Sequence, residues 1–374
     1  MSQQAIVIGA GIVGLATATA LAKKGISVTV IDRHGFAVGA SVRNFGMLWP
    51  IGQPSGVKYE RASRSLAIWK ELCAKAGIWM DPAGSLHLAY DGLEEEVLQG
   101  FLESVSGERP YQLLTAEEVL QRFPAVRPDG LKAGLYSPEE CIVDSPLAIR
   151  ALPAYLSEAY GIRFMWETAV QEVTTGRVRT MHGNFEADLI FVCTGPDFEM
   201  LFPEEFAARS VTRCKLQMLR LGDQPPGWRL GPSLCGGLSL THYPSFGAAG
   251  DALQQLKARF VAELPEHVRW GIHVMVSQHS DGGLIVGDSH EYGNTLEPFD
   301  REEINVAILS YLKRFSALPS YRVTRNWNGI YTKMTDGSTE LVCHPLPGVT
   351  VINGLGGNGM TLSFGLAEEV ISLI

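Results

Sequence analysis

Residues 5–32 read AIVIGAGIVGLATATALAKKGISVTVID, and this stretch decides the fold. It begins with a short apolar run at residues 5–9, continues as an alanine-rich segment typical of a buried helix, and returns to a β-branched run at residues 26–32. Between the first run and the helix stands Gly9-Ala-Gly11-Ile-Val-Gly14, an intact G-x-G-x-x-G motif in the strand–turn–helix context that it requires. The pattern predicts the βαβ unit of a Rossmann-like domain.

Each glycine of this motif has a separate physical task. Gly9 makes the tight turn, Gly11 lets the backbone approach a pyrophosphate, and Gly14 lets the helix pack closely on the strand. The start of the helix offers free amides and the positive end of its dipole to phosphates. Asp32 ends the second strand, where a carboxylate can accept a ribose hydroxyl. The motif predicts dinucleotide binding but does not distinguish NAD from FAD.

A second glycine cluster, GLGGNGMTL at residues 354–362, favours FAD. It follows the apolar run 349–353 and precedes a final helix, and an NAD domain has no need of such a junction so late in the chain. A flavin ring needs amides at its N1–C2=O edge, where reduction leaves negative charge that a helix N-terminus stabilises. At Thr194-Gly195, after the apolar run 189–194, the backbone can approach the cofactor closely at a third place. We therefore expect three strand ends to meet at one flavin nucleotide.

The remaining pattern predicts an α/β protein of two interleaved domains. Short apolar runs alternate with amphipathic stretches along most of the chain. Isolated strand-like runs at residues 211–221, 273–277 and 284–287 predict a second, α+β domain built on a mostly antiparallel sheet. The predicted division assigns residues 1–79, 137–209 and 326–374 to the FAD-binding domain, and residues 80–136 and 210–325 to the substrate-binding domain.

Composition limits the class of partner and the compartment. The formal net charge of −9 and the absence of a basic run disfavour nucleic acid as a partner. Six cysteines without close C-x-x-C spacing are typical of free thiols in a reducing cytoplasm, which is the expected location. The uncharged residues 5–22 have no basic segment before them, so we interpret them as part of the fold rather than as a signal peptide or membrane span. No spacing of histidines or carboxylates predicts a metal site.

Several motifs together resemble the D-amino acid oxidase superfamily of FAD-dependent oxidoreductases. They are GAGIVG with its acidic strand end, ASVRNFGML at residues 40–48, VCTG at 192–195, DGGLIVGD at 281–288 and INGLGGNGMTLSFGLAEEV at 352–370. The resemblance spans the whole chain and is strongest to glycine oxidase and monomeric sarcosine oxidase, the latter through YTKMTD at 331–336. It implies FAD, and oxidation of a primary or secondary amine to an imine that water hydrolyses.

The resemblance also implies which residues contact the cofactor. These are Gly9, Ala10, Gly11, Ile12, Val13, Gly14, Asp32, Arg33, Ala40, Ser41, Arg43, Asn44, Phe45, Gly46, Val170, Thr194, Gly195, Gly329, Gly354, Gly356, Gly357, Asn358, Gly359, Met360 and Thr361. The residues expected around the reacting carbon are His273, Tyr331, Lys333, Trp49 and Met47. His242 and Met275 are further candidates for the wall, with ordinary core positions as the alternative for all of these side chains.

Four positions depart from the family pattern. Gly329 stands where covalently flavinylated relatives have their linking cysteine, so we expect FAD to be held non-covalently. Tyr331 and Thr361 stand where relatives have the arginine or lysine that binds a substrate carboxylate. Ile285 stands where sarcosine oxidases have the lysine that activates oxygen, which favours a dehydrogenase.

Because these basic residues are missing, the sequence does not show which acidic group the substrate carries. Similarity of the VRNFGM and WPIGQP stretches to an aminophosphonate-linked subgroup makes a 2-aminoethylphosphonate-like or N-methylated amine a candidate besides an amino acid. Arg43, Lys215 and Lys333 are the candidate cations for its anion. The alternatives to an amine oxidase that uses O₂ are a flavin dehydrogenase with another acceptor, an FAD-binding protein with a degenerate site, and an NAD-dependent dehydrogenase. The oligomeric state is left open.

Overall fold

The computed structural model describes residues 3–222 and 224–374, and its first layer is a mostly parallel sheet. The strand order is β20-β21-β13-β1-β2-β9, with only β20 antiparallel to its neighbour. The bounds are β1 Gln4–Ile8, β2 Ser27–Ile31, β9 Arg163–Met165, β13 Leu189–Val192, β20 Leu341–Leu346 and β21 Val349–Asn353. The predicted βαβ unit is confirmed, because helix α1 (Ile12–Lys23) connects β1 to β2.

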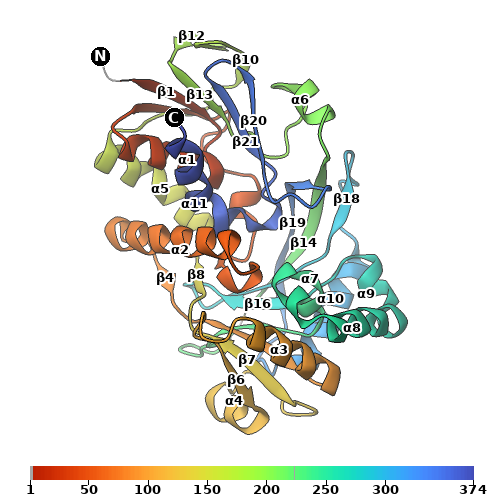
Figure 1. The fold of residues 1–374 in the computed structure, drawn as a ribbon. Helices are drawn as coiled ribbons and strands as arrows, with labels where there is room; N and C mark the ends of the chain where they lie inside the picture. The colour runs from red at the N-terminus through yellow and green to blue at the C-terminus, as the bar shows by residue number, and fades with distance from the viewer. Residues whose placement is uncertain (1–2, 223) are drawn as a thin grey trace.

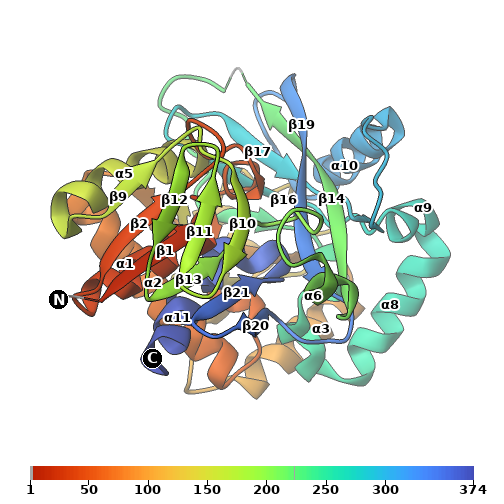
Figure 2. The same cartoon turned by 90° about the horizontal axis from the view of Figure 1, so that it is seen from above.

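Helices cover one face of this sheet, and a three-stranded meander covers the other (Figures 1 and 2). The helices are α1, α5 (Ser145–Tyr160) and α11 (Gly359–Ser372). Helix α2 (Val57–Ala76) packs on α11, and all four helices share one apolar core with alternate residues of β1 and β2. The meander consists of β10 (Val170–Thr174), β11 (Arg177–Thr180) and β12 (Gly183–Glu186). Its valines pack on the opposite residues Ile6, Ile8 and Ile31. Burial on both faces explains why β1 is a continuous apolar run.

A second sheet of nine strands lies beside the first assembly, in the lower right part of Figure 1. The strand pairs are antiparallel except β15 with β5. The bounds are β5 Ser85–Ala89, β6 Gln112–Thr115, β7 Ala133–Ser137, β14 Val211–Leu221, β15 Ser233–Cys235, β16 Met275–Gln278, β17 Leu284–Gly287, β18 Glu291–Gly293 and β19 Val323–Met334. The predicted mostly antiparallel sheet is therefore confirmed.

Helices on this second sheet complete the largest apolar core. They are α3 Gly92–Ser104, α4 Ala116–Arg122, α7 Leu238–His242, α8 Asp251–Glu263, α9 Pro265–Arg269 and α10 Glu302–Phe315. A small sheet of β3 (Met47–Leu48), β8 (Cys141–Val143) and β4 (Met80–Asp81) lies between the two assemblies. The short elements are η1 Ala40–Val42, η2 Pro50–Gly52, α6 Pro203–Ala207, η3 Pro244–Ala249 and η4 Gly356–Asn358.

Strand β19 corrects one predicted domain boundary. It pairs with β14 along its whole length, so residues 326–334 belong to the antiparallel sheet rather than to the FAD-binding domain. A continuous strand stays with the partner that satisfies its backbone hydrogen bonds. The rest of the division remains a prediction.

Two further observations concern the chain as a whole. All six cysteines are buried and unpaired, as predicted. Among residues 3–222 and 224–374, no helix combines the length and the apolar composition needed to cross a bilayer.

Helix α4 begins with a capping box formed by Thr115 and Glu118. The Thr115 hydroxyl accepts from the amide of Glu118, and the Glu118 carboxylate accepts from the amide of Thr115 at 2.8 Å. Thr115→Ala should lower the free energy of unfolding by about 1 kcal/mol without changing cofactor content, because it removes a cap far from the cavity described below. Urea unfolding followed by circular dichroism measures this change, and an unchanged midpoint would contradict the role of the cap.

Candidate functional site

The carboxyl ends of three neighbouring parallel strands meet at one large cavity. Strands β21, β13 and β1 lie side by side in the sheet, and the glycines that follow them, Gly354, Gly195 and Gly9, all line this cavity. Its volume of about 910 Å³ is near the upper end of the range for ligand sites, ~300–1,000 Å³. The predicted convergence of three strand–glycine junctions is therefore confirmed.

The turn after β1 has the geometry of a phosphate cradle. Gly9 has φ +103°, and a Cβ at this position would lie 2.4 Å from the carbonyl oxygen of Cys193. The carboxylate of Asp32 accepts from the amides of Ala10 at 2.7 Å and His34 at 2.9 Å. Because a carboxylate has about four acceptor sites, Asp32 keeps capacity for a ribose hydroxyl while it fixes the turn.

The start of α1 stays open for a ligand beside this turn. The first turn of the helix carries no acidic residue, and the Ser41 hydroxyl accepts from the amide of Ile12 at 2.9 Å. The later amides of a first helical turn have no partner within the helix. They remain available for an anion at the positive end of the helix dipole.

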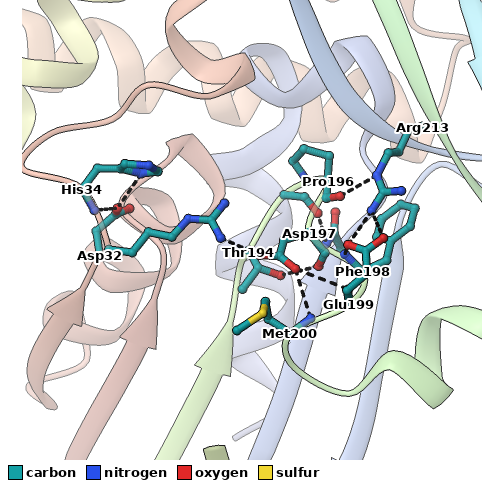
Figure 3. A network of polar contacts seen from close by, with 12 residues as sticks. Asp32, His34, Thr194, Pro196, Asp197, Phe198, Glu199, Met200 and Arg213 are labelled. Carbon is teal, nitrogen blue, oxygen red and sulfur yellow. Dashed lines mark hydrogen bonds and ion pairs between the residues drawn. The ribbon is translucent and has the colours of Figure 1, made fainter. Parts of the chain in front are cut away.

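A network of polar contacts forms the wall of the cavity beside Asp32 (Figure 3). Arg33 donates to Asp197 at 2.6 Å, which joins the end of β2 to the loop after β13. Asp197 in turn accepts from the amide of Met200, and the Thr194 hydroxyl donates to the backbone carbonyl of Asp197. Arg213 of β14 donates to the carbonyl of Pro196 at 2.8 Å. The network holds both assemblies around the same end of the cavity.

The loop around residues 40–46 forms a second wall. The side-chain amide of Asn44 donates to the carbonyls of Ala40 and Ser41, and its oxygen accepts from the amide of Gly46. Arg43 donates to the carbonyls of Val38 at 2.8 Å and Asn328 at 3.1 Å. The loop is thereby fixed against β19 rather than free to move away from a ligand.

At the other end of the cavity, the last glycine cluster meets β19. A Cβ on Gly357 would lie 3.6 Å from the Tyr331 hydroxyl, and helix α11 begins at Gly359 without an acidic residue in its first turn. The Thr361 hydroxyl accepts from the amide of Trp49 at 3.0 Å. A second helix N-terminus therefore faces the cavity, where the reduced form of a flavin ring needs stabilisation. The residues present fit FAD at both ends.

Most predicted cofactor contacts line the cavity. They are Gly9, Gly11, Ile12, Val13, Asp32, Arg33, Ala40, Ser41, Arg43, Asn44, Phe45, Val170, Thr194, Gly195, Gly329, Gly354, Gly356, Gly357, Asn358, Gly359, Met360 and Thr361. Ala10, Gly14 and Gly46 lie behind it. A Cβ on Gly14 would lie 1.8 Å from the carbonyl oxygen of Gly9, and one on Gly46 would lie 1.9 Å from that of Val143. These two glycines therefore serve close backbone packing.

The five residues predicted around the reacting carbon, Met47, Trp49, His273, Tyr331 and Lys333, also line the cavity. Nε2 of His273 lies 2.9 Å from Oδ1 of Asp288, whereas its buried Nδ1 has no hydrogen-bond partner among the described residues. Lys333 donates to the Tyr292 hydroxyl at 2.9 Å. The cavity wall thus contains an imidazole with a carboxylate oxygen beside one ring nitrogen, and an ammonium group bonded to a phenol.

The protonation of this group follows from burial and charge. Burial alone would raise the pKa of Asp288, but the adjacent His273 and His290 outweigh it and hold the pKa below its usual value. Burial lowers the pKa of His290 and, together with His273, lowers that of His242 well below the usual value. Burial raises the pKa of Tyr331 well above that of a free phenol. At neutral pH the cluster holds a charged Asp288, neutral His242 and His290, and a protonated Tyr331.

Sequence reasoning missed Asp288, His290, Tyr292 and Tyr243, all of which line the cavity. Asp288 and His290 follow directly after the buried strand β17. A rule that searches strand ends for polar residues could have found both. Tyr243 and Tyr292 carried no comparable signal.

Three sequence-based assignments need correction. Lys215 does not line the cavity: its ammonium lies 3.4 Å from Asp300 and 3.7 Å from Glu291, on the other face of β14 from the cavity-lining Leu216. Ile285 lies in the apolar core of the second sheet, outside the cavity lining, so it does not bear on the choice of electron acceptor. The strand predicted at residues 273–277 begins only at Met275, so His273 precedes β16 rather than lying on it.

The fold and the cavity define a dinucleotide-dependent oxidoreductase. Its second sheet lies at the end of the cavity that His273 and Tyr331 line. The chain belongs to the DAO family, described as FAD dependent oxidoreductase, whose pattern it matches over residues 4–373. FAD is therefore the cofactor, and the NAD alternative is excluded.

The similar proteins match this chain over most of its length. One of the subunits of opine oxidase from Rhizobium meliloti is 26% identical over 88% of this chain and 82% of its own length. Glycine oxidase of Geobacillus kaustophilus is 25% identical in sequence over 96% of this chain and 89% of its own, and its structure superposes with a TM-score of 0.75 at 20% identity, covering 99% and 94%. L-proline dehydrogenase from P. horikoshii has a TM-score of 0.80 at 21% identity, covering 100% and 93%.

Gly329 leads to a prediction about how the cofactor is attached. It lines the cavity and offers no nucleophile, and a Cβ there would lie 3.3 Å from the carbonyl oxygen of Arg43. Acid precipitation of the purified protein should release all flavin into the supernatant, where its absorbance measures it. Yellow colour that stays with the pellet would contradict non-covalent binding.

Proposed function

We propose that the protein oxidises the C–N bond of a small primary or secondary amine, amino-acid-like or aminophosphonate-like, to an imine that water hydrolyses to a carbonyl compound. When bound, FAD supplies the acceptor, flavin N5, for the hydride that leaves the carbon. The observation that carries the proposal is the cavity itself, which runs from the glycine turn after β1 to the cluster around His273 and Asp288. Relatives named opine oxidase and glycine oxidase support an amine as the donor.

The six buried free thiols support a cytoplasmic location.

His273 is the group we assign to proton removal. An amine must lose its ammonium proton before a hydride can leave the neighbouring carbon, and a base must have a free nitrogen for that proton. Oδ1 of Asp288 lies 2.9 Å from Nε2 of His273, a cavity-lining residue whose buried Nδ1 has no hydrogen-bond partner among the described residues. The carboxylate would orient the ring and stabilise the imidazolium that forms.

Lys333 and Arg43 are the cavity-lining cations that we propose for the acidic group of the substrate. The Lys333 ammonium donates to the Tyr292 hydroxyl, and no carboxylate among the described residues pairs with it. The Arg43 guanidinium donates to two carbonyls, which leaves other N–H groups for an anion. A buried anion needs such a cation together with several donors.

Apolar side chains close the space around the reacting carbon. Trp49 and Met47 are nearly fully buried, and both line the cavity, as Tyr331 does. The Tyr243 hydroxyl lies 3.2 Å from the sulfur of Met275. Such a wall excludes water, favours the neutral amine over the ammonium form, and orients the C–H bond.

An anaerobic screen tests the proposal. The FAD-loaded protein is mixed with amino acids, N-methyl amines and aminophosphonates, and loss of the flavin absorbance at about 450 nm reports reduction. We expect one of these classes to bleach the flavin within seconds. If every class leaves the band unchanged while dithionite bleaches it, the site is degenerate and the proposal fails.

The electron acceptor is assigned by a second measurement on the reduced protein. Rapid reoxidation by air with formation of peroxide identifies an oxidase. Slow reoxidation by air but rapid reoxidation by an artificial quinone acceptor identifies a dehydrogenase.

A further inference from the structure

Three histidines from separate segments meet at the wall of the cavity. They are His242 at the end of α7, His273 before β16 and His290 between β17 and β18. One ring nitrogen of each lies within 4.8 Å of one ring nitrogen of both others. The ring centroids of His273 and His290 are 5.3 Å apart, and those of His242 and His290 are 4.8 Å apart. The spacing in the sequence carries no metal-site signature, which is why only the fold reveals this group.

Two of these rings have an oxygen atom 2.9 Å from one ring nitrogen, which leaves the other nitrogen for a metal. Nε2 of His273 lies 2.9 Å from Oδ1 of Asp288, and Nδ1 of His290 lies 2.9 Å from the carbonyl oxygen of Gly271. Histidines that bind metals almost always donate their other N–H to a carboxylate or a backbone carbonyl, which fixes the ring and its tautomer. Nδ1 of His273 is buried and has no partner among the described residues.

We infer that His242, His273 and His290 form a binding site for a divalent transition-metal ion of the Zn²⁺ type, with one coordination position open to the cavity. Neutral imidazoles suit Zn²⁺, Ni²⁺ and Cu²⁺, and three protein ligands with an open position are the arrangement of accessible zinc sites. The charged Asp288 partly compensates the charge of the ion without occupying a coordination position. Oxygen-preferring ions such as Mg²⁺ find no suitable ligand set here.

A small movement of His242 completes the site. Ligands at about 2.0–2.1 Å from a tetrahedral ion are roughly 3.4 Å apart, so nitrogens that now lie within 4.8 Å of each other must approach by up to about 1.4 Å. The His242 ring lies almost parallel to that of His273, with centroids 3.7 Å apart, and must turn to direct its nitrogen at the same point. His242 lines the cavity and is accessible from it, so the ring can turn toward the cavity side.

Metal binding at this site would oppose the proposed amine oxidation. A metal ion on Nδ1 of His273 occupies the nitrogen that we assign to proton removal. This consequence rests on the proposed function, but the binding itself does not, because it can be measured without substrate. We expect Zn²⁺ to inhibit turnover reversibly and EDTA to restore it.

The test uses the FAD-loaded protein after dialysis against EDTA. Calorimetric titration with Zn²⁺, and titration with Co²⁺ followed by its visible absorption, should each show one ion bound per chain. His242→Ala should weaken binding by about 10-fold or more, and Asp288→Asn by about 10–100-fold, the usual loss for a partner of a metal-bound histidine. His182→Ala is the matched control, since His182 lies in the exposed turn between β11 and β12 and should bind the ion as the parent protein does.

Two outcomes would overturn the inference. One is the absence of saturable binding to the parent protein at one ion per chain. The other is equal affinity in His242→Ala and His182→Ala. His242 is not part of the core, so its variant should keep its FAD spectrum and its circular dichroism, and it carries the test even if Asp288→Asn does not fold. Neither outcome affects the anaerobic amine screen, so failure of this inference and failure of the proposed function are separable.

Discussion

Gly11→Val should give a folded protein that no longer holds FAD. Gly11 lies at the start of α1 and lines the cavity, with φ −72° and ψ 176°, a conformation that valine adopts readily. A Cβ there would meet only the Ser41 hydroxyl oxygen, at 3.1 Å, so the fold tolerates the change. The branched side chain would fill the space where a pyrophosphate approaches the helix N-terminus. We expect the Kd for FAD to rise by about 100-fold or more, or ~2.7 kcal/mol.

Gly92→Val is the matched control for this variant. Gly92 also begins a helix, α3, and a Cβ there would meet no atom within 4 Å. It does not line the cavity. Reconstitution of the apoprotein with FAD, followed by flavin fluorescence, measures both affinities. A Gly11→Val protein that is purified yellow, with the affinity of the control, would contradict the placement of the pyrophosphate.

His273→Gln should lower kcat/KM at neutral pH by about 10²–10⁴-fold with the amine that the screen identifies, the usual range for loss of a general base. The loss should shrink as pH rises toward the pKa of the substrate amine, ~10 for an alkylamine. At such pH the substrate arrives neutral and no base is needed. Steady-state kinetics over a range of pH measures this recovery, with His182→Gln as the control.

Asp288→Asn separates a positioning role from a merely structural one. If Asp288 acts through His273, its loss should shift the pH profile of kcat/KM as well as its height, because the imidazolium loses its carboxylate partner. A loss in His273→Gln that is the same at every pH would contradict the role of His273 as a base. It would instead indicate that the ring only shapes the cavity.

The half of the site that binds the dinucleotide could be predicted because its signals are local. Gly9 and Gly11 act within one turn, and Asp32 ends the next strand. A short stretch of sequence therefore contains all the residues that this part of the site needs. The three apolar runs before Gly9, Gly195 and Gly354 also predict parallel strands, whose carboxyl ends share one edge of a sheet. The structure confirms that arrangement.

The sequence could not show which face of strand β14 Lys215 occupies. On β14, Leu216 and Met218 line the cavity, so the alternation of side chains along a strand places Lys215 on the opposite face, with Asp300 and Glu291. A shift of register by one residue would have reversed these positions. The sequence alone does not show that register.

The sequence by itself determined the βαβ unit, the glycine turns and the family, because close backbone approach to a phosphate or a flavin edge leaves few residue types at those positions. Only the tertiary structure decided which side chains surround the reacting carbon. His242 ends helix α7, His273 precedes β16, and Asp288 and His290 lie between β17 and β18, so these side chains meet only when the elements of the second assembly pack together. Such a cluster depends on packing and strand register, which are properties of the whole fold rather than of any local pattern.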